Sequence, residues 1–374
     1  MNIFKNALMV AGTAVACGTA SAQPAVTING VVDAAVFSGK GESTGVKAAD
    51  ANRKGVLNGG MTTSRLSFQG SEDLGDGLSA FFELSGFIRL DTGAVGRSDA
   101  IGPPVNVGAD PFFSRLSFAG LRNPSWGSLR MGLVSTPMFI NSITTNAFAD
   151  SMVLSPIQLV TFAGGPLSGG TGWANSIAYD SPNWSGFTFA LLGSASENQG
   201  GNNVGGRVRY GQGDFSTSLA WQKVKKNPLT FADGTSPNDT TAWQLAGTYD
   251  FKVAKLFAHV GEIKNNGTDA ARLDITYRIW DLSAAIPVGG TGSVLVGYAN
   301  RKTRDAVAPV PATASGGNLE RKVFTLGYDH YLSKRTDLYA AYTLDRTLTN
   351  TLPAPGRAVS ARGNMLALGM RHRF

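Results

Sequence analysis

Hydrophobic and polar residues alternate along most of this chain. Between Val26 and Phe37 the even positions are apolar or small, whereas several odd positions are polar. Because successive side chains of a β-strand point to opposite faces, this period of two predicts strands with one apolar and one polar face. About sixteen segments, each roughly ten residues long or slightly longer, follow the pattern. They cover residues 26–37, 60–70, 77–91, 111–122, 126–135, 173–181, 185–196, 203–211, 213–225, 240–250, 253–264, 273–288, 292–303, 320–331, 336–347 and 361–374.

The connections between these segments alternate between short and long. Short connections, such as 70–77, 122–125 and 181–184, carry Gly, Pro, Asn and Asp, which are turn formers. Tight turns at one end of the strands and long loops at the other are typical of outer-membrane barrels, with the turns in the periplasm. The long connections are 38–59, 92–110, 136–172, 226–239, 304–319 and 348–360.

Two all-β architectures fit alternating strands. A water-soluble sandwich would point the apolar positions inward, but so many half-apolar strands exceed what one sandwich core covers, and its edges would need protection. A transmembrane antiparallel β-barrel of about sixteen strands closes every edge and pairs all backbone groups within lipid. The barrel is therefore favoured. Beyond the first residues, the absence of an apolar run of about 18 residues excludes a helical membrane protein.

The pentapeptide SRLSF occurs twice, and each copy holds an arginine inside a predicted strand. In a barrel, Arg65 and Arg115 would point into the water-filled lumen. The apolar residues of the two copies would then face lipid; these are Leu66, Phe68, Leu116 and Phe118.

The first residues have the composition of a secretory signal peptide. Lys5 precedes an apolar run, and Ala-Ser-Ala at 20–22 provides a cleavage site, so residues 1–22 are expected to be removed and 23–374 to form one barrel domain. Cys17, the only cysteine, lies in the removed segment, although lipid attachment there is an alternative. The formal charge of +7 is spread along the chain, which disfavours nucleic-acid binding.

Several stretches resemble the general porins of Gram-negative bacteria, in the β-proteobacterial branch. They are VTINGVVDAAV, SRLSFQGSEDLGDGLSAFFELSGF, NSIAYDSPNWSGFTFALLG, YDHYLSKRTDLYAAYT and the terminal LALGMRHRF. The resemblance implies an outer-membrane homotrimer in contact with lipid and lipopolysaccharide, each barrel passing ions and small hydrophilic solutes. It also implies that the third loop, about 136–172, folds inward as a constriction. The terminal Phe374 resembles the signal that the barrel-assembly machinery reads.

The resemblance also indicates candidate constriction residues. The family's wall arginines correspond to Arg65 and Arg115, and we expect Arg130, Glu83 and Asp150 to line the pore with them. Arginines outnumber acids on the predicted lumen face, so a weak to moderate anion preference is expected. A sugar- or organic-acid-specific channel is the alternative. The arginines assigned to that face are Arg65, Arg115, Arg130, Arg207, Arg209, Arg278, Arg371 and Arg373, against Asp33, Glu83 and Asp274.

Other chemistry finds little support. The histidines His259, His330 and His372 accompany no catalytic motif, so no enzyme activity, cofactor or metal site is predicted. Aromatic residues near strand ends are expected to form the belts at the two membrane interfaces. They are Trp126, Trp173, Tyr179, Trp184, Trp221, Trp243, Tyr249 and Trp280.

Overall fold

The structure is a computed structural model that describes residues 26–40, 52–96, 111–162, 168–195, 202–225, 239–266, 275–304, 318–350 and 358–374. The expected signal segment 1–22 and parts of the long loops lie outside the described residues. The strands are β1 (Val26–Lys40), β2 (Asn52–Asn58), β3 (Arg65–Gly75), β4 (Leu78–Phe87), β5 (Leu116–Asn123), β6 (Gly127–Ser135), β7 (Gly172–Asp180), β8 (Phe187–Ser194), β9 (Asn203–Gln212), β10 (Phe215–Val224), β11 (Asp239–Asp250), β12 (Lys255–Asn266), β13 (Ile275–Val288), β14 (Gly292–Arg304), β15 (Asn318–Tyr331), β16 (Thr336–Asn350) and β17 (Ala358–Arg373). Two helices, α1 (Pro137–Thr144) and α2 (Pro156–Thr161), lie between β6 and β7.

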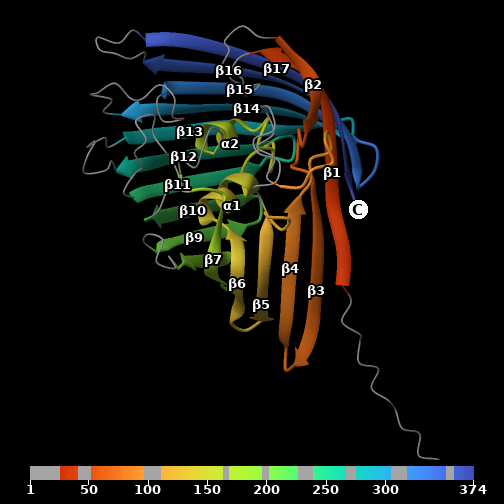
Figure 1. Cartoon of the computed structure of the whole chain (residues 1–374), viewed down its shortest axis with the longest axis vertical. Helices are drawn as coiled ribbons and strands as arrows, with labels where there is room; N and C mark the ends of the chain where they lie inside the picture. The colour runs from red at the N-terminus through yellow and green to blue at the C-terminus, as the bar shows by residue number, and fades with distance from the viewer. Residues whose placement is uncertain are drawn as a thin grey trace, which may run out of the picture.

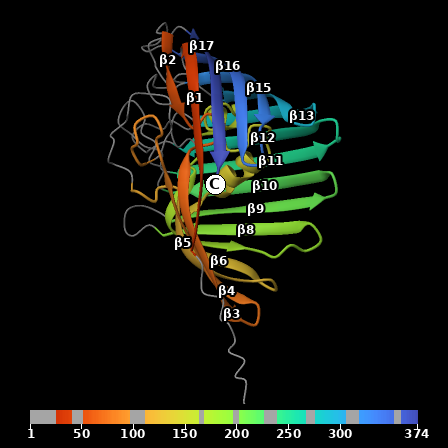
Figure 2. The ribbon, with the colours of Figure 1, turned by 90° about the vertical axis from the view of Figure 1, so that its right-hand side faces the viewer.

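The strands form one closed antiparallel sheet (Figure 1). From β3 onward each strand pairs with its neighbour in sequence, and β1 closes the ring by pairing with β17 from Val31↔Arg373 to Lys40↔Asn364. Figure 2 shows β1, β17 and β16 along this seam. On its other edge β1 pairs with β2 over residues 34–40 and with β3 over residues 26–31. Since β2 and β3 share one place, the ring has sixteen strand positions, which confirms the predicted barrel.

The second strand differs from its prediction. Residues 60–70 were expected to form it, with 38–59 as a loop, but 52–58 are paired as β2 and pairing resumes only at Arg65. The six residues between, 59–64, leave the sheet. They are all buried, and we call them the inward segment.

The chain ends at the same end of the barrel as the short turns. Phe374 exchanges two backbone hydrogen bonds of 3.1 Å with Gly30. Its ring lies over Gly30, where a Cβ would come within 2.7 Å of the ring, so glycine is required there. No helix among the described residues is long and apolar enough to span a membrane.

The outer face carries exposed apolar side chains, as a lipid-facing surface requires. At the short-turn end, aromatic pairs such as Tyr179–Phe189 and Tyr249–Phe251 form part of the expected belt. Trp173 was wrongly assigned to it. Its side chain is buried inside, and its Nε1 donates to the carbonyl of Gly169 at 2.9 Å.

The lipid-facing assignment of Leu116 and Phe118 is wrong. Phe118 shares its face with Glu83 across the β4–β5 pairing, and the guanidinium of Arg130 lies 5.2 Å from its ring. Both residues are buried in an inner cluster with Val134, whereas Ala119 and Leu121 are exposed outside. Strand β5 begins only at Leu116, after a bend at Arg115, so alternation does not extend back to the arginine.

Arg278 was wrongly placed in the lumen. Its side chain is 62% exposed on the outer face, 3.7 Å from Glu262. Its neighbours Ile275, Tyr277 and Ile279 instead point inward and are buried in one cluster with α2. At this end of β13 the apolar side therefore faces a loop inside the barrel, while the outer side carries Arg278 beyond the exposed Trp280 and Leu282.

A probe on β5 distinguishes the two assignments of this strand. A fluorophore on Ala119→Cys should be quenched by nitroxide-labelled lipid as strongly as one on Met131→Cys, which is exposed outside on β6. The inward-facing Ser128→Cys serves as the unquenched control. If the fluorophore at position 119 is quenched no more strongly than the one at 128, the lipid-facing assignment of Leu116 and Phe118 was correct.

Candidate functional site

The third loop, residues 136–171, folds into the barrel and carries both helices (Figure 1). Its two ends are joined where the amide of Thr136 donates to the carbonyl of Thr171 at 3.0 Å. The side chain of Thr136 caps α1 by accepting from the amide of Phe139. Each helix has proline at its first position, where a missing N–H costs nothing. Neither helix was predicted from the sequence, although Thr-Pro and Ser-Pro are signals for a helix start.

Helix α1 is fixed to the wall by amide hydrogen bonds. The Asn141 side chain donates from Nδ2 to Gln244 Oε1 at 3.0 Å and accepts at Oδ1 from Ser218 Oγ at 2.5 Å. All three side chains are buried. A buried polar group without a hydrogen bond destabilises the folded protein, so these bonds favour one position of the helix.

A buried histidine holds the end of α1. His259 of β12 contacts Thr145 Oγ1 through Nε2 at 2.7 Å and Asp281 through Nδ1 at 3.1 Å. Thr145 Oγ1 donates to the carbonyl of Asn141, so Nε2 donates to Thr145. The order carboxylate, imidazole, hydroxyl is that of a hydrolase triad, but here the hydroxyl proton is given to backbone and His259 is 2% exposed. The group therefore acts as an anchor for the loop.

Helix α2 is held at its carboxyl end by two wall arginines. Arg321 Nη1 donates to the carbonyl of Leu159 at 2.8 Å, and Arg301 Nη1 donates to that of Val160 at 2.9 Å. Cations there satisfy carbonyls that lack intrahelical partners and oppose the negative end of the helix dipole. Arg321 is itself paired with Asp345 at 2.6 Å. Arg301 and Arg321 therefore hold α2 in place.

Apolar packing beneath the loop completes its attachment. Met138, Ile157 and Val160 of the loop pack on Ile263 and Tyr277 of the wall. Burying such side chains contributes about 1.5–3 kcal/mol each. The loop thereby covers much of the inner wall, and the barrel is narrowed on this side.

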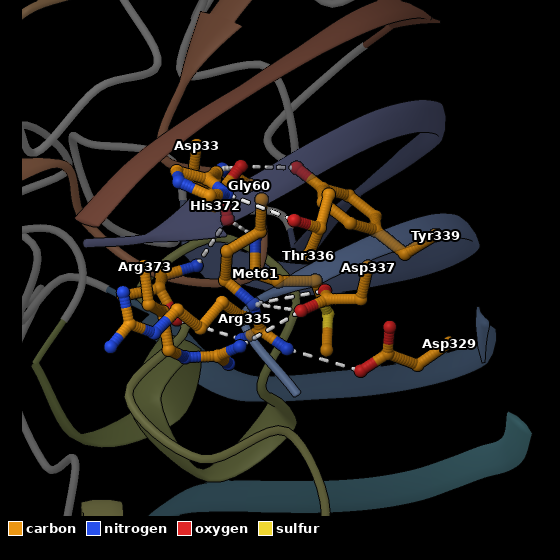
Figure 3. A network of polar contacts seen from close by, with 12 residues as sticks. Asp33, Gly60, Met61, Asp329, Arg335, Thr336, Asp337, Tyr339, His372 and Arg373 are labelled. Atoms are coloured by element: carbon orange, nitrogen blue, oxygen red, sulfur yellow. Dashed lines mark hydrogen bonds and ion pairs between the residues drawn. The ribbon is translucent and has the colours of Figure 1, made fainter. Parts of the chain in front are cut away.

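The inward segment is organised by one carboxylate (Figure 3). Asp33 of β1 accepts from the backbone amides of Gly60, Met61 and Thr62 at 2.7–3.0 Å. It also accepts from the hydroxyl of Tyr339 at 2.5 Å. Its side chain is fully buried. A Cβ at position 60 would lie 2.2 Å from that hydroxyl, so glycine is required for this approach.

The inward segment links the seam to the tip of the third loop. Thr62 Oγ1 accepts from Arg371 Nη1 at 2.8 Å and donates to Asp150 at 2.9 Å, while Arg65 donates to the other oxygen of Asp150 at 2.9 Å. Arg371 is buried and also bonded to Asp337 and Asp329. A continuous polar chain therefore runs from β15–β17 through the inward segment to Arg65.

The other candidate residues also form ion pairs. Arg115 Nη1 lies 3.0 Å from Glu83 and 3.3 Å from Ser85 Oγ. Arg130 Nη2 lies 2.5 Å from Asp180. The structure thus brings Arg65 to Asp150 and Arg115 to Glu83, whereas Arg130 takes a carboxylate outside the predicted set. Asp180 is the last residue of β7, and nothing in the sequence indicated that it would pair with Arg130.

Two further arginines lie on the inner face of β9 beside α1. Arg207 Nη1 is 3.4 Å from Thr144 Oγ1, and Arg209 is two residues further along the same face. Within the described parts of the chain, no ion pair involves either one. Among the described residues, arginines therefore outnumber acids on the inner wall of β3–β9 and the loop tip beside it. The arginines are Arg65, Arg115, Arg122, Arg130, Arg207 and Arg209, and the acids are Asp73, Glu83 and Asp180 on the wall and Asp150 on the loop.

A closed sixteen-position barrel with an inward-folded loop and a charged inner wall is the architecture of an aqueous membrane channel. A family model described as Gram-negative porin matches residues 7–350. The chain belongs to this family, and it is an outer-membrane protein.

Two curated relatives match over nearly their whole length. Outer membrane porin protein 32 of Delftia acidovorans is 30% identical, over 99% of this chain and 100% of the relative. An outer membrane porin of Bordetella pertussis is 25% identical, over 98% of each.

Solved structures agree on the fold. An anion-selective porin from Comamonas acidovorans superposes with a TM-score of 0.74 at 27% identity, over 94% of this chain and 100% of that one. OmpT of Vibrio cholerae, solved in a trimer form, has a TM-score of 0.63 at 12% identity, over 94% and 99%. The latter likeness concerns the fold alone.

Removing the Asp33 carboxylate should release the inward segment. Asp33→Ala leaves four donors without this acceptor, and we expect a loss of about 2–4 kcal/mol in unfolding free energy. Urea unfolding in detergent micelles, followed by gel mobility, measures it. Asp73→Ala is the control, because Asp73 accepts one amide in an exposed turn. Equal midpoints for the two variants would contradict the role of Asp33.

Proposed function

We propose that this porin is a general diffusion channel with a weak to moderate preference for anions. The arginine excess on the wall of β3–β9 carries the proposal. A charge of one sign in a narrow lumen with low-dielectric walls concentrates the opposite ion. In this reading Arg65, Arg115, Arg130, Glu83 and Asp150 line the constriction, and Arg207 and Arg209 supply the net charge.

The ion pairs moderate the preference. Arg65, Arg115 and Arg130 each lie within 3.0 Å of a carboxylate, so a passing anion meets a nearly neutral pair there. Their alternating charges orient water and solutes across the lumen. The anion selectivity stated for the Comamonas relative supports the same sign of selectivity here.

The alternative of a sugar- or organic-acid-specific channel gains no support from the aromatic residues. Most of the large exposed aromatics, among them Trp221, Trp243 and Tyr249, share the outer face with leucines. A stacking surface for sugars would require them inside. We also propose that the His259 group holds the loop and performs no catalysis.

The partners follow from the outer surface. Phe112, Phe113 and Phe68 form an aromatic cluster outside β3, with ring centroids 4.9 and 6.3 Å apart. Such an apolar patch suits contact between protomers, and the trimer form of the Vibrio relative supports a homotrimer. We further propose contact with outer-membrane lipid and lipopolysaccharide, and recognition of Phe374 by the barrel-assembly machinery.

Zero-current potentials of the porin in a planar bilayer under a KCl gradient test the proposal. The wild type should favour chloride, and Arg207→Gln/Arg209→Gln should lower the chloride-to-potassium permeability ratio by up to about five-fold per charge at low salt, since one charge at ~8 Å in water shifts the two ions by ~0.5 kcal/mol in opposite directions. Asp150→Asn should raise the ratio. Lys334→Gln/Arg335→Gln, in the short turn after β15, should leave it unchanged. A cation-selective wild type would refute the proposal.

A further inference from the structure

Cations occupy directly opposed positions on the outer face at the long-loop end of β12–β17. Arg278 is opposite Lys302, and in the adjacent row Lys322, Arg346 and Arg362 are opposite one another on three successive strands. All are on the outer face and exposed or partly exposed. We call these five residues, with Lys264, the basic band.

The position of the basic band relative to the membrane follows from the side chains next to it on the outer face. Two residues nearer the middle of β13 and β16 the same face carries Trp280 and Leu344, and on β17 it carries Leu366 four residues from Arg362; these three side chains are 41–46% exposed. These side chains belong to the lipid-facing surface. The basic band therefore lies immediately beyond the hydrocarbon, at the level of lipid headgroups on the long-loop side.

The protein itself does not balance this charge. Among the described residues, Glu262 pairs with Arg278 at 3.7 Å and Glu320 with Lys322 at 2.9 Å, leaving an excess of four positive charges. Arg346 donates from Nε to the neutral hydroxyl Oγ of Ser360 at 3.4 Å. Like charges directly opposite each other destabilise a sheet pair. A persistent anion between them would reverse that effect.

We propose that the basic band binds the phosphate groups of a phosphorylated outer-leaflet lipid whose acyl chains lie on Leu344 and Leu366. Arginines bind phosphate through two parallel donors, and lysines add charge. Adjacent strands lie about 4.8 Å apart, so Lys322 and Arg362 span about 10 Å, enough for one phosphorylated headgroup. This deepens the proposed contact with lipopolysaccharide by assigning its site, and it is independent of the charge of the lumen.

Native mass spectrometry of delipidated porin in neutral detergent tests the assignment. With bisphosphorylated lipid A, we expect Lys322→Gln/Arg346→Gln to lose at least about ten-fold in apparent affinity. Lys334→Gln/Arg335→Gln removes the same residue types from the opposite end of the same strand pair, and should bind like the wild type. Dephosphorylated lipid A should bind the wild type as weakly as bisphosphorylated lipid A binds the band variant.

Other outcomes overturn the proposal. Equal binding by both variants would show that the band is not the site, and equal binding of dephosphorylated lipid would show that apolar contact suffices. If inorganic phosphate alone raises the thermal midpoint of the wild type as much as lipid A does, the band is an anion site without lipid preference. Planar-bilayer conductance of the band variant should equal that of the wild type, so failure here leaves the pore proposal standing.

Discussion

The position of the ion pair between Arg65 and Asp150 depends on the carboxylate of Asp33. It gathers three backbone amides of the inward segment and the hydroxyl of Tyr339 at one buried point. This holds Thr62 where it can join Arg371 to Asp150, and Asp150 in turn orients Arg65. The inward segment, which separates β2 from β3, therefore supports the tip of the third loop.

The rest of the third loop is held by the wall it covers. Wall arginines cap α2, a histidine anchors α1, and apolar side chains fill the space between. The inner face of the barrel consequently has two kinds of surface. The part under the loop is packed like a protein core, and the part opposite carries the arginines and their acids.

These two kinds of inner surface explain which features could be predicted from the sequence and which could not. Lipid requires closed hydrogen bonding and an apolar outer face, so the strands, the barrel and the lumen position of Arg65 could be predicted from alternation. Alternation cannot tell lipid from the underside of an inward loop, since both are apolar. Arg278 was therefore wrongly assigned to the lumen. Phe118 was wrongly assigned to lipid for a different reason, because the bend at Arg115 breaks the alternation before β5.

Pairings between residues far apart in the chain could not be predicted from the sequence either. Asp33 and Tyr339 are 306 positions apart and meet only because β1 closes on β17 and β16 lies next. The single acid in an apolar strand and the paired glycines at 59–60 were signals of the inward segment, but neither reveals its partner. Asp180 likewise becomes a partner of Arg130 only through the register of β6 and β7.

We propose that an excess of fixed arginine charge inside the barrel sets the selectivity of the pore. The most direct test is the zero-current potential of the unmodified porin at a constant KCl ratio and varied mean concentration. Because the Debye length grows from about 3 Å at 1 M to about 30 Å at 0.01 M, chloride preference should increase as the salt is diluted. A preference that is independent of salt, or that becomes cationic on dilution, would contradict the account.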